Sequence, residues 1–428
     1  MVAAYLRHVA RFSSAAKLFL AGAFLEGIGH GILWVLRNLF LKECGLSEGF
    51  IGNTMSIAAL GTLVVAVPLA FFMDRGRLKG YVIAGTLAFA GGLAGMALWP
   101  KPLPILASNF VAGGGMALLG IGSAPFFMRH STPEERPFLF AVGTAIGPAA
   151  GLVGGGLVWL LSLAWGEGFA AQRAMLLVAA GVSAASIPVF ALLREAPAEA
   201  PPPGPRRLVE REAIMLCAPN VLIGLGAGLT IPFINLYFRD RFGQGPGAIS
   251  VLFSVAQVAT FFAFLAAPVV ARRAGGVRTI VACQLLSIPF FVVMAFTQSL
   301  WLAMAGFLGR HALMNMAMPV AANFAMEVVP SDQRALTSGL RELTWDGAWL
   351  VSTSLGGWMI QHTRLVHDGY TVTMLVTIGL YVAGSGAFWM LWRKSPAMPP
   401  GPHHASRITP DGTHPEHVAP AETPANRP

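Results

Sequence analysis

The stretch Gly27-Ile28-Gly29-His30-Gly31, which continues to Asn38-Leu39-Phe40-Leu41-Lys42, returns 197 residues later as Gly224-Leu225-Gly226-Ala227-Gly228, continuing to Asn235-Leu236-Tyr237-Phe238-Arg239. Five of the sixteen aligned positions are identical, and most of the others are conservative. The chain therefore contains two copies of one plan, which indicates the duplication of an ancestral half. Membrane transporters are commonly built from such repeats, with the substrate site between the halves.

The composition places the chain in a lipid bilayer. Hydrophobic residues make up 55% and charged residues 11% of the chain, and its mean hydropathy is +0.63. This is more apolar length than a soluble core can bury. Runs long enough to cross a hydrocarbon core of ~30 Å as helices occur at residues 17–41, 50–73, 80–99, 103–128, 138–163, 171–193, 213–238, 247–271, 278–298, 301–326, 337–361 and 371–392. They lack the alternation of outer-membrane strands, so helices are the expected spanning structure.

Six of these runs fall in each half, and a polar, proline-rich segment separates the halves. We expect an N-terminal bundle at residues 1–195, a cytoplasmic linker at 196–212, a C-terminal bundle at 213–394 and a disordered cytoplasmic tail at 395–428. Lys and Arg concentrate in the loops on the side of the two termini, which predicts that both termini are cytoplasmic. The net charge of +9 is then a topology signal, and nucleic acid is not an expected partner.

A loop after the second helix links the chain to a known family. Asp74-Arg75-Gly76-Arg77-Leu78-Lys79 resembles the Gly-x-Leu-Ala-Asp-Arg-x-Gly-Arg-Arg motif of the major facilitator superfamily, although Ala70 stands at the first Gly and Gly76 comes one residue early. The likeness covers residues 15–393. It implies an all-α membrane protein with twelve transmembrane helices, arranged as two six-helix bundles related by a pseudo-twofold axis along the membrane normal.

The same resemblance implies an inner gate. Asp74, Arg75 and Arg77 are then the residues that hold the gate in the outward-open state, with Asp346 of the eleventh helix near them. The alternative is a cytoplasmic turn that obeys the positive-inside rule. For Asp346 the alternative is structural pairing with Arg341.

The fifth helix carries a second element that resembles the family. Gly143, Gly147, Gly151 and Gly155 recur every four residues, and Pro148 follows the second of them. This spacing places the glycines on one helix face, where a neighbouring backbone can approach closely. The pattern looks like the Gly-Pro signature of proton-coupled antiporters. A generic close-packing face explains the same spacing.

Ionisable residues inside the predicted helices give the candidate site. An ionised side chain near a helix centre costs about 2.5 to 3.5 kcal/mol on insertion scales, so it is retained with a partner or a purpose. The resemblance implies that helices 1, 4, 7 and 10 line a central cavity. The predicted proton- and substrate-binding residues are Glu26, His30, Arg37, Asn38, Asn235, Arg310, His311 and Asn315.

Each of these residues also has a structural reading. Glu26 is the expected proton carrier, or else pairs with a neighbouring His or Arg to hold helices together. Arg310 is expected to pair with Glu26 or with an anionic substrate, and His30 and His311 suit proton coupling. Asn38 and Asn235, the clearest symmetric polar pair, are expected either to line the cavity or to form hydrogen bonds at helix ends.

These features predict a secondary active transporter of a small organic solute in the plasma (inner) membrane, working by proton antiport as an exporter. The alternatives are a uniporter or proton symporter for a sugar or organic anion, and a receptor that transports nothing. Motifs of metalloproteases, hydrolases and ATPases are absent from the sequence, so we expect no enzyme activity and no cofactor. We expect a monomer and no metal site, with metal binding by His403, His404, His414 and His417 as the alternative.

Overall fold

The structure is a computed structural model in which residues 12–72, 78–132, 135–194, 211–330, 333–363 and 368–395 are described. All regular secondary structure in these ranges is helical. The helices of the first half are α2 (Ser14–Glu43), α3 (Glu48–Phe72), α4 (Leu78–Leu98), α5 (Pro102–Arg129), α6 (Arg136–Trp165), α7 (Phe169–Ala184) and α8 (Ser186–Ala191). Those of the second half are α9 (Arg211–Thr230), the 3-10 helix η2 (Ile231–Phe233), α10 (Ile234–Phe242), α11 (Pro246–Ala274), α12 (Gly276–Leu286), α13 (Ile288–Phe296), α14 (Leu300–Val328), α15 (Arg334–His362) and α16 (Gly369–Trp392).

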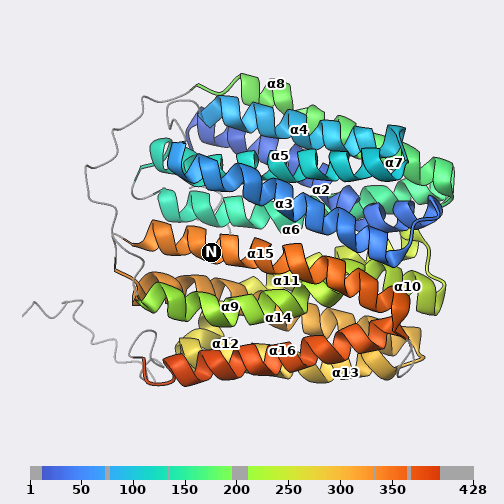
Figure 1. Ribbon diagram of the computed structural model, residues 1–428. Helices are drawn as coiled ribbons and strands as arrows, with labels where there is room; N and C mark the ends of the chain where they lie inside the picture. Colours follow the sequence, from blue (N-terminus) through green and yellow to red (C-terminus); the bar gives the residue numbers. More distant parts are fainter. Residues whose placement is uncertain are drawn as a thin grey trace, which may run out of the picture.

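The helices form two bundles that lie one above the other, with α2 to α8 in one and α9 to α16 in the other (Figure 1). At the boundary α3 packs against α15, and α6 packs against α11. Under the sequence repeat α3 corresponds to α11 and α6 to α15, so the two contacts are equivalent. This arrangement confirms the predicted all-α membrane fold of two six-helix bundles.

Twelve helical segments correspond to the twelve predicted spans, and ten of those described are apolar enough to cross a membrane by length and composition. The other two are α14 and α15, each 29 residues long. Their length suffices at ~1.5 Å of rise per residue. They are less apolar because they carry the Arg310–His311 and Arg341–Glu342 pairs. Polar helices inside a membrane bundle mark a functional region.

The repeated glycines are sites of close helix packing in both halves. Gly27 and Gly31 face α6, whereas Gly29 between them faces α7. A Cβ atom on Gly31 would lie 3.0 Å from the Cα atom of Gly151. In the second half the three equivalent glycines face α15 and α16 in the same order. The repeated glycine run therefore fixes how the first helix of each half packs against the fifth and sixth helices.

Three spans that the sequence predicts as continuous are interrupted. The breaks lie between α7 and α8, between α9 and α10, and between α12 and α13. Pro188, Pro232 and Pro289 each stand just after a break or within it. Proline removes a backbone N–H donor and its ring clashes with the preceding turn, so each span is interrupted within the three residues before its proline. Pro68, Pro148, Pro219, Pro268 and Pro319, by contrast, lie inside uninterrupted helices.

Among the described residues, contacts between the halves concentrate at the end of the molecule where α2 ends and α3 begins, here named the closed end. The opposite end carries the start of α2 and the end of α16 and is named the terminal end. At the closed end the Nη2 atom of Arg239 donates to Glu43 at 2.7 Å. Glu167 Oε1 accepts a hydrogen bond from the backbone N–H of Gly247 at 2.8 Å, close to the N-terminus of α11. A carboxylate is favourable there because it faces the positive end of the helix dipole.

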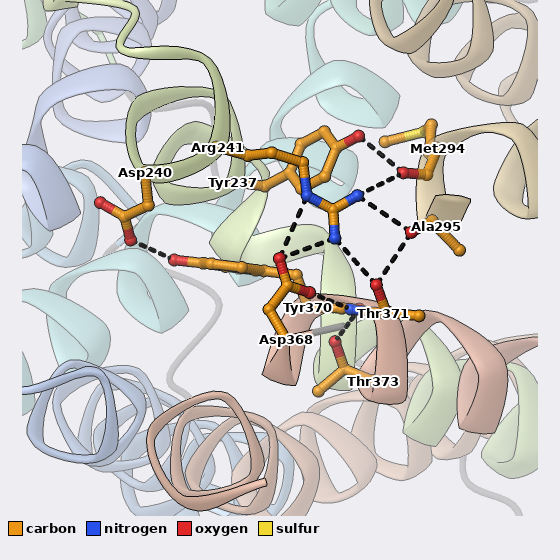
Figure 2. A network of polar contacts seen from close by, with 9 residues as sticks. All are labelled: Tyr237, Asp240, Arg241, Met294, Ala295, Asp368, Tyr370, Thr371 and Thr373. Atoms are coloured by element: carbon orange, nitrogen blue, oxygen red, sulfur yellow. Dashed lines mark hydrogen bonds and ion pairs between the residues drawn. The ribbon is translucent and has the colours of Figure 1, made fainter. Parts of the chain in front are cut away.

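Arg241 fastens three helices of the second half together at the closed end (Figure 2). Its side chain is 6% exposed and donates to the carboxylate of Asp368 at 2.7 and 3.1 Å. It also donates to the carbonyl oxygens of Met294 and Ala295 at 3.0 and 2.9 Å and to Thr371 Oγ1 at 2.8 Å. These bonds join α10, α13 and α16, so the closed end of this bundle is rigidly cross-linked.

Candidate functional site

A cavity of about 660 Å³ lies in the second half, among α9, α12, α14, α15 and α16. Its volume suits a small organic molecule. Three aromatic residues, Trp345, Trp349 and Tyr381, contribute to its wall. The polar residues that line it are Asn220, Gln284, Arg310, His311, Asn315, Asn323, Ser338, Arg341 and Glu342.

The cavity runs from the middle of the molecule toward the terminal end. Trp349, one of its wall residues, lies half-way along α15. Met326 and Ser338, two others, lie near the ends of α14 and α15 at the terminal end. In the part of the chain that the structure describes, the contacts between the halves concentrate at the other end, which favours access of a solute from the terminal end.

Arg310 presents a buried positive charge to the cavity. The residue is 5% exposed, and its Nη2 atom donates to the hydroxyl of Tyr381 at 2.7 Å. Its guanidinium carbon lies 5.1 Å from the ring centre of Phe291, a cation–π distance. The ion pairs among the described residues do not include Arg310, and its Nε atom has no hydrogen-bond partner there. The expected pairing with Glu26 is therefore absent, and the charge is held by neutral groups alone.

Two further predicted residues of α14 also line the cavity. The ring of His311 lies 5.4 Å from that of Phe307, centre to centre. The amide Nδ2 of Asn315 donates to the carbonyl oxygen of His311 at 2.8 Å, one turn back along the helix. The structure thus brings Arg310, His311 and Asn315 together on one cavity wall.

A row of rings connects the cavity to the first half. Trp345 and Trp349 of α15 lie 6.1 Å apart, and Trp349 lies 6.3 Å from Trp34 of α2. Trp34 in turn stacks on His30 at 6.3 Å. The row begins in the cavity wall at Trp345 and Trp349 and crosses the boundary between the halves to Trp34. None of the three tryptophans was singled out from the sequence, although Trp345 and Trp349 share a helix face with Arg341 by their spacing of four.

Glu26, His30 and Arg37 do not line this cavity. They share a face of α2 with Trp34 by their spacing of four, four and three residues. Each keeps one buried polar atom with no hydrogen-bond partner among the described residues, namely Glu26 Oε1, His30 Nδ1 and Arg37 Nε. The ion pairs of the described part include none of the three. Pairing of Glu26 with a neighbouring His or Arg, the structural alternative, is not observed.

Asn38 and Asn235 form hydrogen bonds between the halves and do not line the cavity. They are 1% and 2% exposed, and the Nδ2 atom of Asn38 donates to Oδ1 of Asn235 at 3.0 Å. The sequence left two roles open, cavity lining and hydrogen bonding at helix ends. In the structure both residues form hydrogen bonds near helix ends.

The predicted gate is only partly visible. Asp74, Arg75 and Arg77 lie outside the described residues, so the resemblance is the sole support for their role. Asp346 is half-buried in α15, and no ion pair with Arg341 is found in the described part of the chain. Structural pairing of Asp346 with Arg341, the alternative to the gate role, is therefore not observed.

The glycines of α6 have different surroundings. A Cβ atom on Gly151 would lie 2.8 Å from Gln257 Nε2 of α11, and one on Gly155 would lie 2.3 Å from Ser254 Oγ. These two glycines therefore allow the halves to approach each other. Gly143 faces the ring of Phe127 in its own half. A Cβ atom on Gly147 would meet nothing within 4 Å, and the helix continues unbroken through Pro148 beside it.

Metal ligands are not grouped in the described part of the chain: no cluster of three or more His, Cys, Asp or Glu residues there is suited to hold an ion. The four tail histidines lie outside the described residues. The three cysteines, Cys44, Cys217 and Cys283, are free thiols.

A model of the Major Facilitator Superfamily matches the sequence twice, at residues 19–216 and 214–415. The chain belongs to this superfamily. It is therefore a multi-pass membrane transporter with a small-molecule substrate, and the resemblance inferred from the loop and the repeat is confirmed. The two matches correspond to the two copies of the sequence plan.

Solved structures of other transporters share this fold. A nucleoside transporter, NupG, aligns with a TM-score of 0.72 at 14% identity, over 89% of this chain and 100% of its own. A D-xylose-proton symporter aligns with a TM-score of 0.73 at 13% identity, over 92% of this chain and 99% of its own. A bacterial homolog of the human lysosomal transporter Spinster, in an inward-facing conformation, aligns with a TM-score of 0.70 at 14% identity. The alignment covers 88% of this chain and 96% of the homolog. Identities this low establish the fold alone, and a search of curated proteins finds no significant sequence match.

Proposed function

We propose that this protein is a proton-coupled antiporter that exports a small organic solute through rocking of its two halves. The observation that carries the proposal is Glu26, whose Oε1 atom is buried in the middle of α2 with no hydrogen-bond partner among the described residues. An ionised carboxylate without a cation or donor is costly inside a bilayer. The residue is therefore suited to hold a proton while buried and to release it when water reaches it.

The cavity and the contacts between the halves supply the transport route. The described contacts between the halves gather at the closed end, while the cavity runs toward the terminal end. Alternating access requires these contacts to open and equivalent contacts at the terminal end to form. We assign the latter role to Asp74, Arg75, Arg77 and Asp346.

We further propose that the protein lies in the plasma membrane as a monomer. Both of its termini would then face the cytoplasm. The distribution of Lys and Arg among the loops supports this orientation. The structure then corresponds to a state in which the cavity is reached from the cytoplasm. In this orientation residues 196–212 form a cytoplasmic linker between the two halves, and residues 395–428 form a cytoplasmic tail.

The test is solute flux in proteoliposomes under an imposed pH gradient. A panel of drugs, nucleosides, sugars, amino acids and carboxylates is first screened for compounds that raise the melting temperature of the purified protein. For a compound that does so, the gradient should accelerate flux in the wild type and in Glu212→Gln, an acid at the start of α9. Glu26→Gln should transport without responding to the gradient. Gradient-independent flux in the wild type would remove the proton claim.

A second candidate is a uniporter or proton symporter of an organic anion, and Arg310 favours it. An arginine that lines a cavity without an acidic partner among the described residues provides charge-assisted hydrogen bonds for a carboxylate or phosphate. Arg310→Gln should then abolish transport of anions and leave transport of neutral compounds unchanged. Equal loss for both classes would assign Arg310 a structural role.

A further inference from the structure

A second hollow lies on the outside of the second bundle, between α12 and α16. It measures about 460 Å³ and is separate from the transport cavity. Helix α12 contributes Arg278, Val281, Ala282 and Leu285, and α16 contributes Val382, Ser385, Gly386 and Trp389. Each set has the spacing i, i+3, i+4 and i+7, which is one face of a helix. Two facing helices thus form a groove along the membrane direction.

The groove is apolar along its length. Leu285 and Val382 remain 40% and 49% exposed in its walls. Gly386 forms part of the floor, because a Cβ atom there would meet nothing within 4 Å. From Arg278 to Leu285 the groove extends about 10 Å along α12, compared with ~15 Å for the hydrocarbon depth of one leaflet. The groove therefore accommodates about two thirds of the depth that one acyl chain spans.

The end of the groove is strongly basic. Arg278 lines it at the start of α12, close to the terminal end of the molecule. Four more exposed basic residues lie at this end of the bundle without lining the groove, Arg272 and Arg273 at the end of α11 and Arg393 and Lys394 just after α16. The described ion pairs include none of the five. A negative headgroup would therefore meet a free positive patch at the depth where headgroups lie.

We propose that the groove between α12 and α16 binds one anionic phospholipid, with an acyl chain between the helices and its phosphate at Arg278. The acyl chain of a zwitterionic lipid would also fill the apolar groove, but its headgroup carries no net charge and would be attracted less strongly to the basic residues. The charge at this end thus selects an anionic lipid of the adjoining leaflet. The inference does not depend on the proposed transport reaction, because it rests on a different surface.

Native mass spectrometry of the full-length protein in mixtures of phosphatidylglycerol and phosphatidylcholine tests the proposal. The wild type should retain phosphatidylglycerol in preference. Arg278→Gln should weaken this retention about fivefold, the effect of one basic residue near an anionic surface. Gly386→Leu should abolish retention of both lipids at the site by filling the groove, and Ala282→Leu, from the opposite wall, provides a second blocking variant should the first not fold.

Two matched variants serve as controls. Gly91→Leu makes the same change at a glycine that also faces open space but lies on α4 of the other bundle. Arg194→Gln removes an exposed basic residue from the terminal end of the other bundle. Both should retain phosphatidylglycerol as the wild type does. Unchanged lipid retention in the groove variants, or an equal loss of retention in the controls, would overturn the proposal. Loss of retention in Arg278→Gln alone would also overturn it, because it would indicate only a charged surface.

Discussion

Asn38 and Asn235 occupy equivalent positions of the repeat and hydrogen-bond to each other across the boundary between the halves. The Nδ2 atom of Asn38 also donates to the carbonyl oxygen of Pro232 at 2.7 Å, and that of Asn235 donates to Val35 at 3.0 Å. Val35 and Pro232 are themselves 197 residues apart, so the contact is reciprocal. Isologous dimer interfaces have this property. The duplicated chain therefore retains a contact that two identical halves would make.

We predict that Asn38→Ala and Asn235→Ala each shift the protein away from the state closed at this end. Each change removes hydrogen bonds worth about 1 kcal/mol net, or about a fivefold change in the population ratio. The double variant should add little, because the two residues share one contact. Spin labels at exposed Lys101 and Trp301, on opposite halves of the closed end, report the change as a longer distance.

Asn109→Ala is the control for this experiment. Asn109 is also buried, but its amide donates to the carbonyl oxygen of Ile105 within its own helix. It should leave the distance between the labels unchanged. A shift in the control equal to that in the two variants would mean that general loss of stability is being measured.

A second prediction concerns the crossing of α3 and α15. A Cβ atom on Gly52 would lie 2.4 Å from the backbone oxygen of Thr353, and one on Gly357 would lie 2.3 Å from that of Glu48. Backbone atoms cannot move aside without separating the helices, so Gly52→Ala should open the closed end. Gly91→Ala, where open space surrounds the glycine, should not. The same pair of labels measures both, and an unmoved distance in Gly52→Ala would contradict the packing described.

Arg241→Gln should destabilise the second bundle without changing which end is closed. The change removes the cationic partner of Asp368 and one of the two donors to each of the carbonyl oxygens of Met294 and Ala295. The Asp368 side chain is 35% exposed, so the pair is only partly buried and its loss should cost about 1 to 3 kcal/mol. Thermal unfolding in detergent should show a clear loss of melting temperature. Arg239→Gln, at a more exposed pair in the same helix, should have a smaller effect.

Asp368 predicts how stability depends on pH. Burial alone would raise the pKa of this carboxyl, but hydrogen bonds from Arg241 and Thr371 and the charge of Arg241 together hold the pKa below its ordinary value of 3.8. The carboxyl is thus more acidic folded than unfolded, so its stabilisation is present above pH 3.8 and is lost as the pH falls through its folded pKa. Asp368→Asn should be less stable at neutral pH and should lose less on acidification. Parallel melting curves for both proteins would contradict this assignment.

The repeat, the number of spans and the family follow from the sequence because glycine spacing, apolar length and charge distribution are local signals. The sequence also indicates Arg310, His311 and Asn315, since a charged or polar residue inside an apolar helix can be recognised whichever face of the helix it lies on. It does not predict that Glu26 and Arg310 remain apart, because that depends on how two helices rotate against each other. Trp34 and Trp349 were missed for the same reason: an aromatic residue in an apolar helix carries no signal of its contacts.

The breaks in three spans show a related limit. Pro188, Pro232 and Pro289 interrupt their helices, whereas Pro148 and Pro268 do not. All five lack the same backbone donor. Neighbouring helices determine whether the freed carbonyl is satisfied in place or the helix restarts, and a single sequence does not supply that context.

The central claim is that a proton crosses against the solute and that Glu26 carries it. Its most direct test is the internal pH of proteoliposomes filled with the dye pyranine, followed while a compound that raises the melting temperature is added outside. The account predicts proton release from the vesicles as the compound enters, and no proton movement in Glu26→Gln. Protons that enter with the compound, or compound uptake with no change in internal pH, would contradict it.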